Sequence, residues 1–144
     1  MIGIINYGLG NLSSVNNAFK KVSEDVEVFD DPNLINKYSK LVLPGVGSFR
    51  AGMSLLIEKK WNDKIDNFVK SGKYLFGICL GMQLLFKNGY ENGETEGLNF
   101  IEGSVTEMKV EKDLKLPHVG WNSLMFKKKN EIFNKINKNI DYYF

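Results

Sequence analysis

The sequence has few of the residues on which disulfides, metal sites and nucleic-acid interfaces depend. Its 144 residues include one cysteine, Cys79, one histidine, His118, and one arginine, Arg50. A single cysteine excludes an internal disulfide, and one cysteine with one distant histidine argues against a zinc site. Arginine is the usual bidentate partner of phosphate and guanine, so its scarcity argues against nucleic-acid recognition. We therefore expect no metal, no cofactor and no nucleic-acid partner.

The sequence also lacks an apolar run of membrane-spanning length, which would require about 18 consecutive residues. Its first residues, "MIGIINYGLGN", have neither the basic start nor the small-residue cleavage site of a signal peptide. Hydrophobic residues make up 43% and charged residues 25%, with a formal net charge of +2. These values are ordinary for a soluble globular protein. We expect a cytoplasmic protein without a membrane partner, folded as a single domain over residues 1–144.

Short apolar runs alternate with segments of helical periodicity along the first half of the chain. The runs predict strands at residues 2–6, 26–29, 40–43 and 74–78, and the periodic segments predict helices within 12–22 and 61–69. This alternation is typical of βα units around a mostly parallel sheet. In the second half, residues 101–110 predict extended, hairpin-like chain, and the apolar residues between 132 and 140 have the spacing of a short amphipathic helix.

The segment "GKYLFGICLGMQLLF" contains Cys79 between Gly77 and Gly81. In the pattern G-x-C-x-G, a strand turns abruptly into a helix, and the junction residue takes a strained backbone conformation. The two glycines leave room for the chain to approach itself closely. The sulfur then projects above the sheet, where first-turn amides face any oxyanion formed nearby. A buried structural cysteine is the alternative, but the flanking glycines favour a nucleophile.

A second segment, "LPGVG", also follows a predicted buried strand. In a parallel sheet this places Gly45 and Gly47 at the same carboxyl edge as Cys79, which is where open α/β folds place their sites. The glycines let peptide planes rotate and present amides to a reacting carbonyl. A simple strand-to-helix turn explains the segment equally well.

The motifs "PGVGSF", "GICLGMQLLF" and "LPHVGWN", in this order, resemble those of class I glutamine amidotransferases. Within that class they are similar to the glutaminase subunits of imidazole glycerol phosphate synthase, which supply ammonia in histidine biosynthesis. The resemblance extends from "IINYGLGNLSSV" to "DYYF". It implies a doubly wound, mostly parallel, flavodoxin-like α/β fold with an antiparallel hairpin extension in the second half.

The resemblance also implies a role for particular residues. Cys79 would attack the side-chain amide of L-glutamine and form a thioester, releasing ammonia. The implied oxyanion hole consists of backbone amides at Leu80, Val46 and Gly47. The residues implied to hold the substrate are Gln83, Glu91 and Gly45. For Glu91, whose carboxylate would pair with the substrate ammonium, an ordinary solvated loop residue is the alternative.

The segment "LPHVGWN" resembles the part of these subunits that faces a (β/α)8-barrel cyclase, the partner that receives the ammonia. The residues implied to lie at this interface are His118, Trp121 and Asn122. Aromatic residues often anchor protein interfaces, although Trp121 also fits a core position. The histidine of this motif is not the catalytic one in the family, so we assign no base role to His118.

One departure from the family pattern concerns the catalytic triad. These enzymes complete a Cys-His-Glu triad with residues near their C-terminus, and this sequence has no histidine after His118. We therefore expect an incomplete amidotransferase domain that is inactive alone. Two other functions remain open: an ammonia-supplying subunit for a surface-sugar amidotransferase, and a non-catalytic binding or regulatory subunit.

Overall fold

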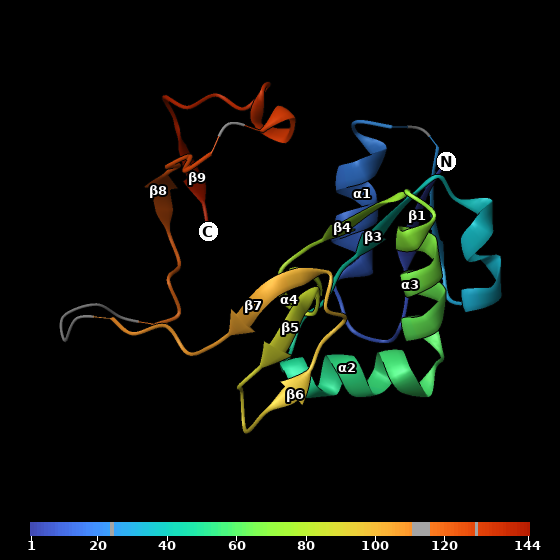
Figure 1. Cartoon of the computed structure of the whole chain (residues 1–144). Coiled ribbons are helices and arrows are strands. Elements are labelled where there is room, and N and C mark those ends of the chain that lie inside the picture. Colours follow the sequence, from blue (N-terminus) through green and yellow to red (C-terminus); the bar gives the residue numbers. More distant parts are fainter. Residues whose placement is uncertain (24, 111–115, 129) are drawn as a thin grey trace. The chain divides into compact units, whose positions relative to one another are not determined.

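Four parallel strands form the central sheet of the first part of the chain, as the apolar runs predict. In the computed structural model of the protein (Figure 1), the order β2-β1-β3-β4 combines β1 (Ile2–Ile5), β2 (Val26–Phe29), β3 (Lys40–Leu43) and β4 (Tyr74–Gly77). Leu43 pairs with Gly77, so β3 and β4 end at the same edge. That edge carries both the loop after β3 and the turn with Cys79.

Helices cover both faces of this sheet (Figure 1), and their bounds are α1 (Leu12–Lys20), the 3-10 helix η1 (Pro32–Lys37), α2 (Phe49–Glu58), α3 (Trp61–Lys70) and α4 (Leu80–Gln83). α1 packs beside β2 on one face, whereas η1 and α3 pack against each other on the other face. This arrangement confirms the doubly wound, mostly parallel α/β fold.

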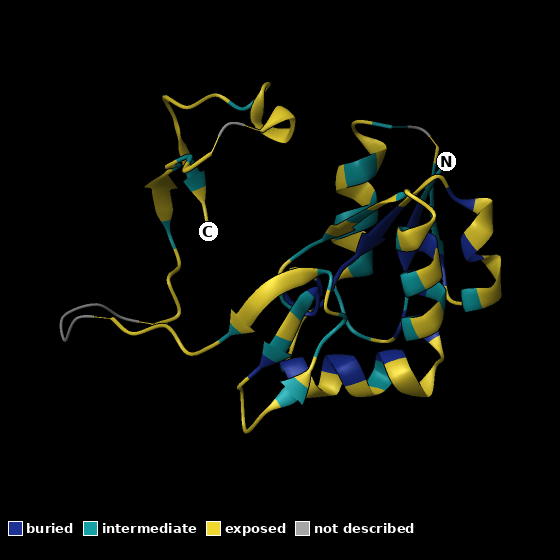
Figure 2. Ribbon diagram, viewed as in Figure 1, coloured by how far each residue is buried: buried dark blue, intermediate teal, exposed yellow. Residues whose placement is uncertain are grey.

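The main core lies between the sheet and the layer formed by η1, α2 and α3. Ile5 and Leu41 are at most 1% exposed and pack in one cluster with Trp61 of α3. Because side chains alternate along a strand, Ile4 and Val42 point to the opposite face, where they are also buried. Figure 2 shows the buried residues concentrated in the central strands and on the inward faces of the helices. Burial on both faces explains the uninterrupted apolar runs of these strands.

Side-chain caps determine where two of the helices begin. The Asn11 side chain accepts a hydrogen bond from the Ser14 amide at the start of α1, which is a common N-terminal cap. Ser48 accepts one from the Ala51 amide at the start of α2. We did not predict α2 from the sequence, although Ser48 before the buried residues of that helix is an ordinary N-terminal signal.

A small second sheet contains β5 (Phe86–Gly89), β6 (Thr95–Glu96) and β7 (Ile101–Val105), in the order β6-β5-β7. β5 and β6 form an antiparallel hairpin, whereas β7 pairs with β5 in parallel. The predicted hairpin is therefore present, but it precedes residues 101–110. Asn92 and Gly93 have φ values of 56° and 98°, which close the hairpin at this point.

The structure describes residues 1–23, 25–110, 116–128 and 130–144. The chain divides into two compact units, Met1–Glu107 and Met108–Phe144. The second unit contains β8 (Trp121–Ser123), the 3-10 helix η2 (Glu131–Phe133) and β9 (Asp141–Tyr143), and β8 and β9 form an antiparallel pair. The single domain expected over residues 1–144 stays a prediction.

The amphipathic helix predicted between residues 132 and 140 is wrong. Only the single 3-10 turn η2 forms there, and both Ile132 and Ile140 are exposed. The side chains of Asn130 and Asn137 accept hydrogen bonds from amides two residues further along the chain. Such local bonds favour turns over helix, so the apolar spacing alone is not sufficient.

Candidate active site

Cys79 lies at a sharp turn between β4 and α4. Its φ of 54° and ψ of −118° place a non-glycine residue in a sparsely populated backbone region. The residue is exposed, so the sulfur is not enclosed in the core. The strained junction that the G-x-C-x-G pattern predicts is therefore present in the structure.

The two flanking glycines occupy positions where a side chain has no room. A Cβ atom on Gly77 would lie 2.5 Å from Cα of Met82, and one on Gly81 would overlap the carbonyl oxygen of Leu43. Both obstacles are backbone atoms, which have little freedom to move aside. The turn thus passes directly against the end of β3, and this close approach is the physical reason for the glycine spacing.

The loop after β3, residues 44–47, packs against this turn at one end and is open at the other. A Cβ atom on Gly45 would lie 2.9 Å from the Gly81 amide nitrogen and 2.6 Å from the Tyr7 hydroxyl oxygen. Val46 is 52% exposed. Gly47 has a φ of 109°, and a Cβ atom there would meet nothing within 4 Å. We call residues 44–47 the oxyanion loop, after the role predicted for them.

A pocket of about 580 Å³ opens beside Cys79. Its lining residues are Gly47, Cys79, Leu80, Gln83, Tyr90, Glu91, Asn92, Val105, Thr106 and Glu107. Five of the residues predicted to hold or transform the substrate thus share one pocket. Gly45 and Val46 belong to the adjoining oxyanion loop but not to the lining. The sequence analysis did not identify the contributions of Tyr90, Asn92 and β7, because they depend on the position of the second sheet.

Tyr7 is a further residue at this edge that the sequence analysis did not assign. It is fully buried, and its hydroxyl group has no hydrogen-bond partner among the described residues. Burial raises the pKa of Tyr7 to about 12, and the nearby Cys79 adds to the increase. The available sequence signal that Tyr7 belongs to this site was its position in the motif "IINYGLGN". Tyr7 therefore packs behind the oxyanion loop as a neutral side chain.

Glu91 makes a contact that its predicted role does not include. Its Oε2 atom accepts a hydrogen bond of 2.9 Å from the Phe49 amide, the first residue of α2. A carboxylate at this position satisfies a free first-turn amide and is favoured by the helix dipole. Glu91 is therefore a partner of α2 as well as a lining residue of the pocket.

The residues predicted to face a partner all lie in the second unit. Trp121 is 72% exposed, and its ring centroid lies 5.6 Å from that of Tyr143. His118 packs against the last residue of the sequence, Phe144, with the two ring centroids 5.8 Å apart. Asn122 is exposed. The exposure of Trp121 argues against the core alternative, and an interface role stays a prediction.

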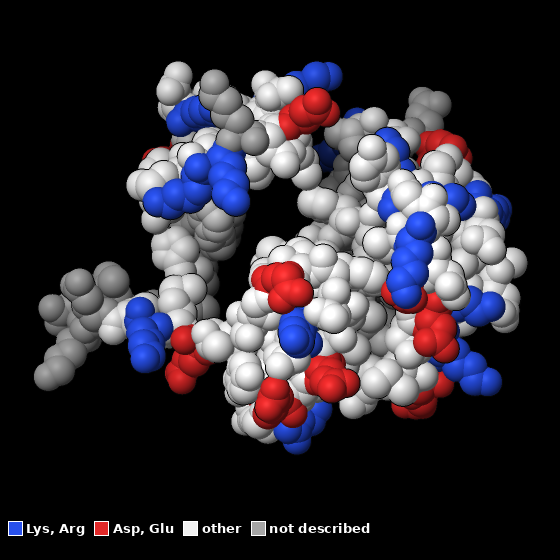
Figure 3. Space-filling model, viewed as in Figure 1, with Lys and Arg blue, Asp and Glu red and all other residues white. Residues whose placement is uncertain are grey.

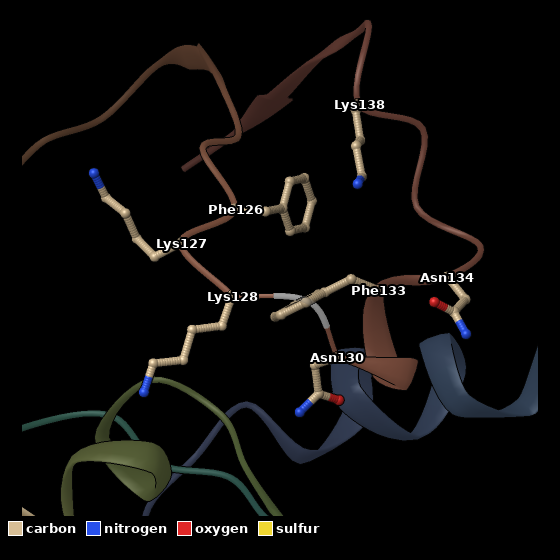
Figure 4. Close-up of a pocket in the computed structure, with 7 residues that line it drawn as sticks. All are labelled: Phe126, Lys127, Lys128, Asn130, Phe133, Asn134 and Lys138. Carbon is tan, nitrogen blue, oxygen red and sulfur yellow. The ribbon is translucent and has the colours of Figure 1, made fainter.

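The second unit has a pocket of its own, of about 490 Å³ (Figure 4), lined by Phe126, Lys127, Lys128, Asn130, Phe133, Asn134 and Lys138. The rings of Phe126 and Phe133 meet edge to face at 4.9 Å, and the Lys138 ammonium lies 5.0 Å from the Phe126 centroid. None of these lining residues is a cysteine, a histidine or a carboxylate. The Cys79 pocket is therefore the better candidate for covalent chemistry.

The described residues contain neither a metal-binding cluster nor a membrane-spanning helix. Outside positions 24, 111–115 and 129, no group of three histidine, cysteine or acidic side chains gathers as a metal site. Across the same part of the chain, no helix is both long and apolar enough to cross a membrane. Acidic and basic side chains are interspersed on the visible face of the first unit (Figure 3).

Comparison with known proteins identifies the family. The family model described as "Glutamine amidotransferase class-I" matches residues 3–144. The chain belongs to the class I glutamine amidotransferases. Among solved structures, one described as a crystal structure of glutamine amidotransferase has a TM-score of 0.62 at 22% identity, covering 72% of this chain and 54% of that one. This likeness supports the fold.

Several curated relatives of this amidotransferase chain are named "Imidazole glycerol phosphate synthase subunit HisH". The protein from Caldanaerobacter subterraneus subsp. tengcongensis is 46% identical over 142 residues, which is 99% of this chain and 68% of the relative. The protein from Sulfurimonas denitrificans is 44% identical, over 100% of this chain and 70% of the relative. The protein from Bacillus subtilis is 40% identical, over 99% and 69%.

Proposed function

We propose that this chain is a glutaminase subunit of imidazole glycerol phosphate synthase, whose Cys79 acts on L-glutamine and which supplies ammonia to a cyclase in the cytoplasm. Because no histidine follows His118 in these 144 residues, we expect them to carry the nucleophile and the substrate pocket but to be inactive in turnover by themselves. Relatives that are 40% to 46% identical to it are named "Imidazole glycerol phosphate synthase subunit HisH". The observation that carries the chemistry is the exposed Cys79 on its strained turn, in one pocket with Gln83 and Glu91.

In the proposed reaction, the Cys79 sulfur attacks the carbon of the glutamine carboxamide. The carbonyl oxygen becomes an oxyanion, which the amide of Leu80 and an amide of the oxyanion loop, at Val46 or Gly47, stabilise. The carbon–nitrogen bond then breaks, and the nitrogen takes up the proton that the Cys79 thiol has given up and leaves as ammonia. Water cleaves the resulting thioester to give glutamate and free thiol. No step requires a metal or an organic cofactor.

The lining of the pocket fits the ends of a glutamine molecule. Glu91 offers a negative charge for the ammonium group, and the Gln83 amide offers both a donor and an acceptor. Gly45, within the oxyanion loop, allows the close packing on which this side of the site depends. These groups hold the reacting carbonyl beside Cys79, and such positioning contributes strongly to rate.

The proposed partner is a (β/α)8-barrel cyclase, contacted through His118, Trp121 and Asn122. An exposed tryptophan is a common anchor of protein interfaces, because it buries a large area with few rotatable bonds. The exposure of Trp121 in this structure supports that role.

Labelling of Cys79 tests the proposed substrate and nucleophile. A glutamine-shaped chloroketone, 2-amino-4-oxo-5-chloropentanoate, alkylates a thiol when sulfur displaces chloride. We expect it to modify the wild-type chain at Cys79, L-glutamine to protect against the reaction, and D-glutamine not to protect. The Cys79→Ala variant should remain unlabelled. Labelling that L-glutamine does not slow, or glutaminase activity in Cys79→Ala, would overturn the proposal.

A further inference from the structure

The hairpin β5–β6 and the first turn of α2 are fastened together beside the Cys79 pocket. Arg50 donates from Nη2 to the Asn92 carbonyl at 2.7 Å and from Nε to the Thr95 hydroxyl at 3.3 Å. Glu91 accepts from the Phe49 amide at 2.9 Å. Three hydrogen bonds thus join residues that are 42 to 45 positions apart in sequence.

The Phe49 ring packs between the first turn of α2 and the β5–β6 hairpin and so couples their positions. The ring is 1% exposed. A Cβ atom on Gly97 would lie 3.0 Å from its Cζ atom, and one on Gly89 would overlap the ring. The ring therefore fills the space that glycines leave open under the hairpin. A shift of the hairpin would move the start of α2 with it.

The start of α2 is also the end of the oxyanion loop. Phe49 follows Gly47 after one residue, Ser48, which caps the helix. Gly47 has a positive φ and no close neighbours for a side chain, so the loop has few contacts of its own at that point. Its position consequently depends on how firmly the Phe49 amide is held, and Glu91 holds that amide.

We propose that Arg50 is a positioning residue for the glutaminase reaction, because it clamps the turn at residues 91–95 onto α2 and so places Glu91 and the oxyanion loop relative to Cys79. Arginine suits this task, since its planar guanidinium presents two donors in fixed directions to a carbonyl and a hydroxyl. The inference rests on the proposed function and extends it by linking the carboxylate of the substrate site to the oxyanion loop.

The test compares two reagents that alkylate Cys79 of the full chain, the only cysteine present. The chloroketone requires the substrate site, whereas iodoacetamide reports only on the exposed thiol. For Arg50→Ala we expect the chloroketone efficiency, kinact/KI, to fall about tenfold or more, because small misplacements of reacting groups are costly. The iodoacetamide rate should stay within about twofold. Arg50→Lys should show most of the loss, because an ammonium group lacks the two-point geometry.

Two further variants separate positioning from charge. Glu91→Gln keeps an oxygen that accepts from the Phe49 amide but loses the negative charge, so we expect KI to rise with kinact nearly unchanged. Arg50→Ala keeps that charge but releases both Glu91 and the oxyanion loop, so we expect kinact to fall as well as KI to rise. Lys87→Ala is the matched control, since Lys87 is an exposed cation on the same hairpin. It should match the wild type with both reagents.

The experiment distinguishes a failure of the proposed role of Arg50 from a failure of the proposed function. If L-glutamine protects the wild type and folded Arg50→Ala reacts with the chloroketone at the wild-type efficiency, the role of Arg50 is wrong and the function stands. If L-glutamine gives no protection in the wild type, the function itself is wrong. Should Arg50→Ala fail to fold, Thr95→Val removes only the acceptor of Nε. A fall of about threefold is then expected, and an unchanged efficiency refutes the clamp.

Discussion

For the replacement of Gly81 by alanine, helix propensity and tertiary packing predict opposite changes in stability. Gly81 lies in α4, where alanine is a better helix former than glycine by about 1 kcal/mol. Helix propensity alone therefore predicts a more stable protein. The tertiary structure predicts the reverse, because the added Cβ atom would overlap the Leu43 carbonyl oxygen.

The size of the loss follows from the backbone contacts of this turn. Relief of the overlap requires α4 to move away from β3, which weakens the bond from the Ile78 amide to the Leu43 carbonyl, 3.0 Å long. Overpacking costs about 1–3 kcal/mol, and an unmade buried hydrogen bond costs about 1–3 kcal/mol. After the gain in propensity, we expect Gly81→Ala to lower the free energy of unfolding by about 1–5 kcal/mol.

Urea unfolding, followed by the fluorescence of buried Trp61, measures this change through the midpoint at an unchanged slope. Gly72→Ala is the control, because Gly72 has a φ of 83° and no neighbour within 4 Å of an added Cβ atom. Backbone strain alone should cost that variant about 1–2 kcal/mol. A Gly81→Ala protein as stable as the wild type, or more stable, would refute the steric explanation of the motif.

Two further predictions concern pH and the partner. Burial raises the pKa of Tyr7 to about 12, compared with an ordinary value of 10.0. The contribution of neutral Tyr7 to the free energy of unfolding is therefore complete below pH 10 and is lost as the pH rises to 12. We expect the free energy of unfolding to fall by about 2–3 kcal/mol over that range, and less in Tyr7→Phe; equal slopes in both proteins would contradict this. Acrylamide should quench the emission of exposed Trp121, and a bound cyclase should protect it while buried Trp61 stays unchanged. Trp121→Phe assigns the signal, and quenching that the cyclase leaves unaltered would argue against the interface.

The strands of the central sheet were predictable because their signal is local. Each is a short apolar run. A strand that is buried on both faces has apolar side chains at successive positions, so its sequence stands out from the polar segments around it. The turn at Cys79 was predictable for a similar reason, since the steric demand of the turn falls on Gly77 and Gly81, within two residues of it. The helix predicted between residues 132 and 140 was wrong, because apolar spacing alone does not form a helix when the 3-10 turn there buries none of its residues.

Contacts between distant segments were not predictable in the same way. The parallel pairing of β7 with β5 places the hairpin earlier than expected. The bond from Phe49 to Glu91 spans 42 residues, and the approach of Tyr7 to Gly45 joins two separate loops. Neither leaves a pattern in neighbouring residues.

The sequence by itself determined the position of the proposed nucleophile, the single cysteine, and the shape of the turn that exposes it, because a cysteine between two glycines constrains its own backbone. The tertiary structure decided which groups surround that sulfur. The oxyanion loop, Glu91 and Arg50 come from separate segments, and only the packing of α2 under the hairpin brings them together. Short-range sterics act between chain neighbours, whereas the geometry of the pocket depends on every layer of the fold around it.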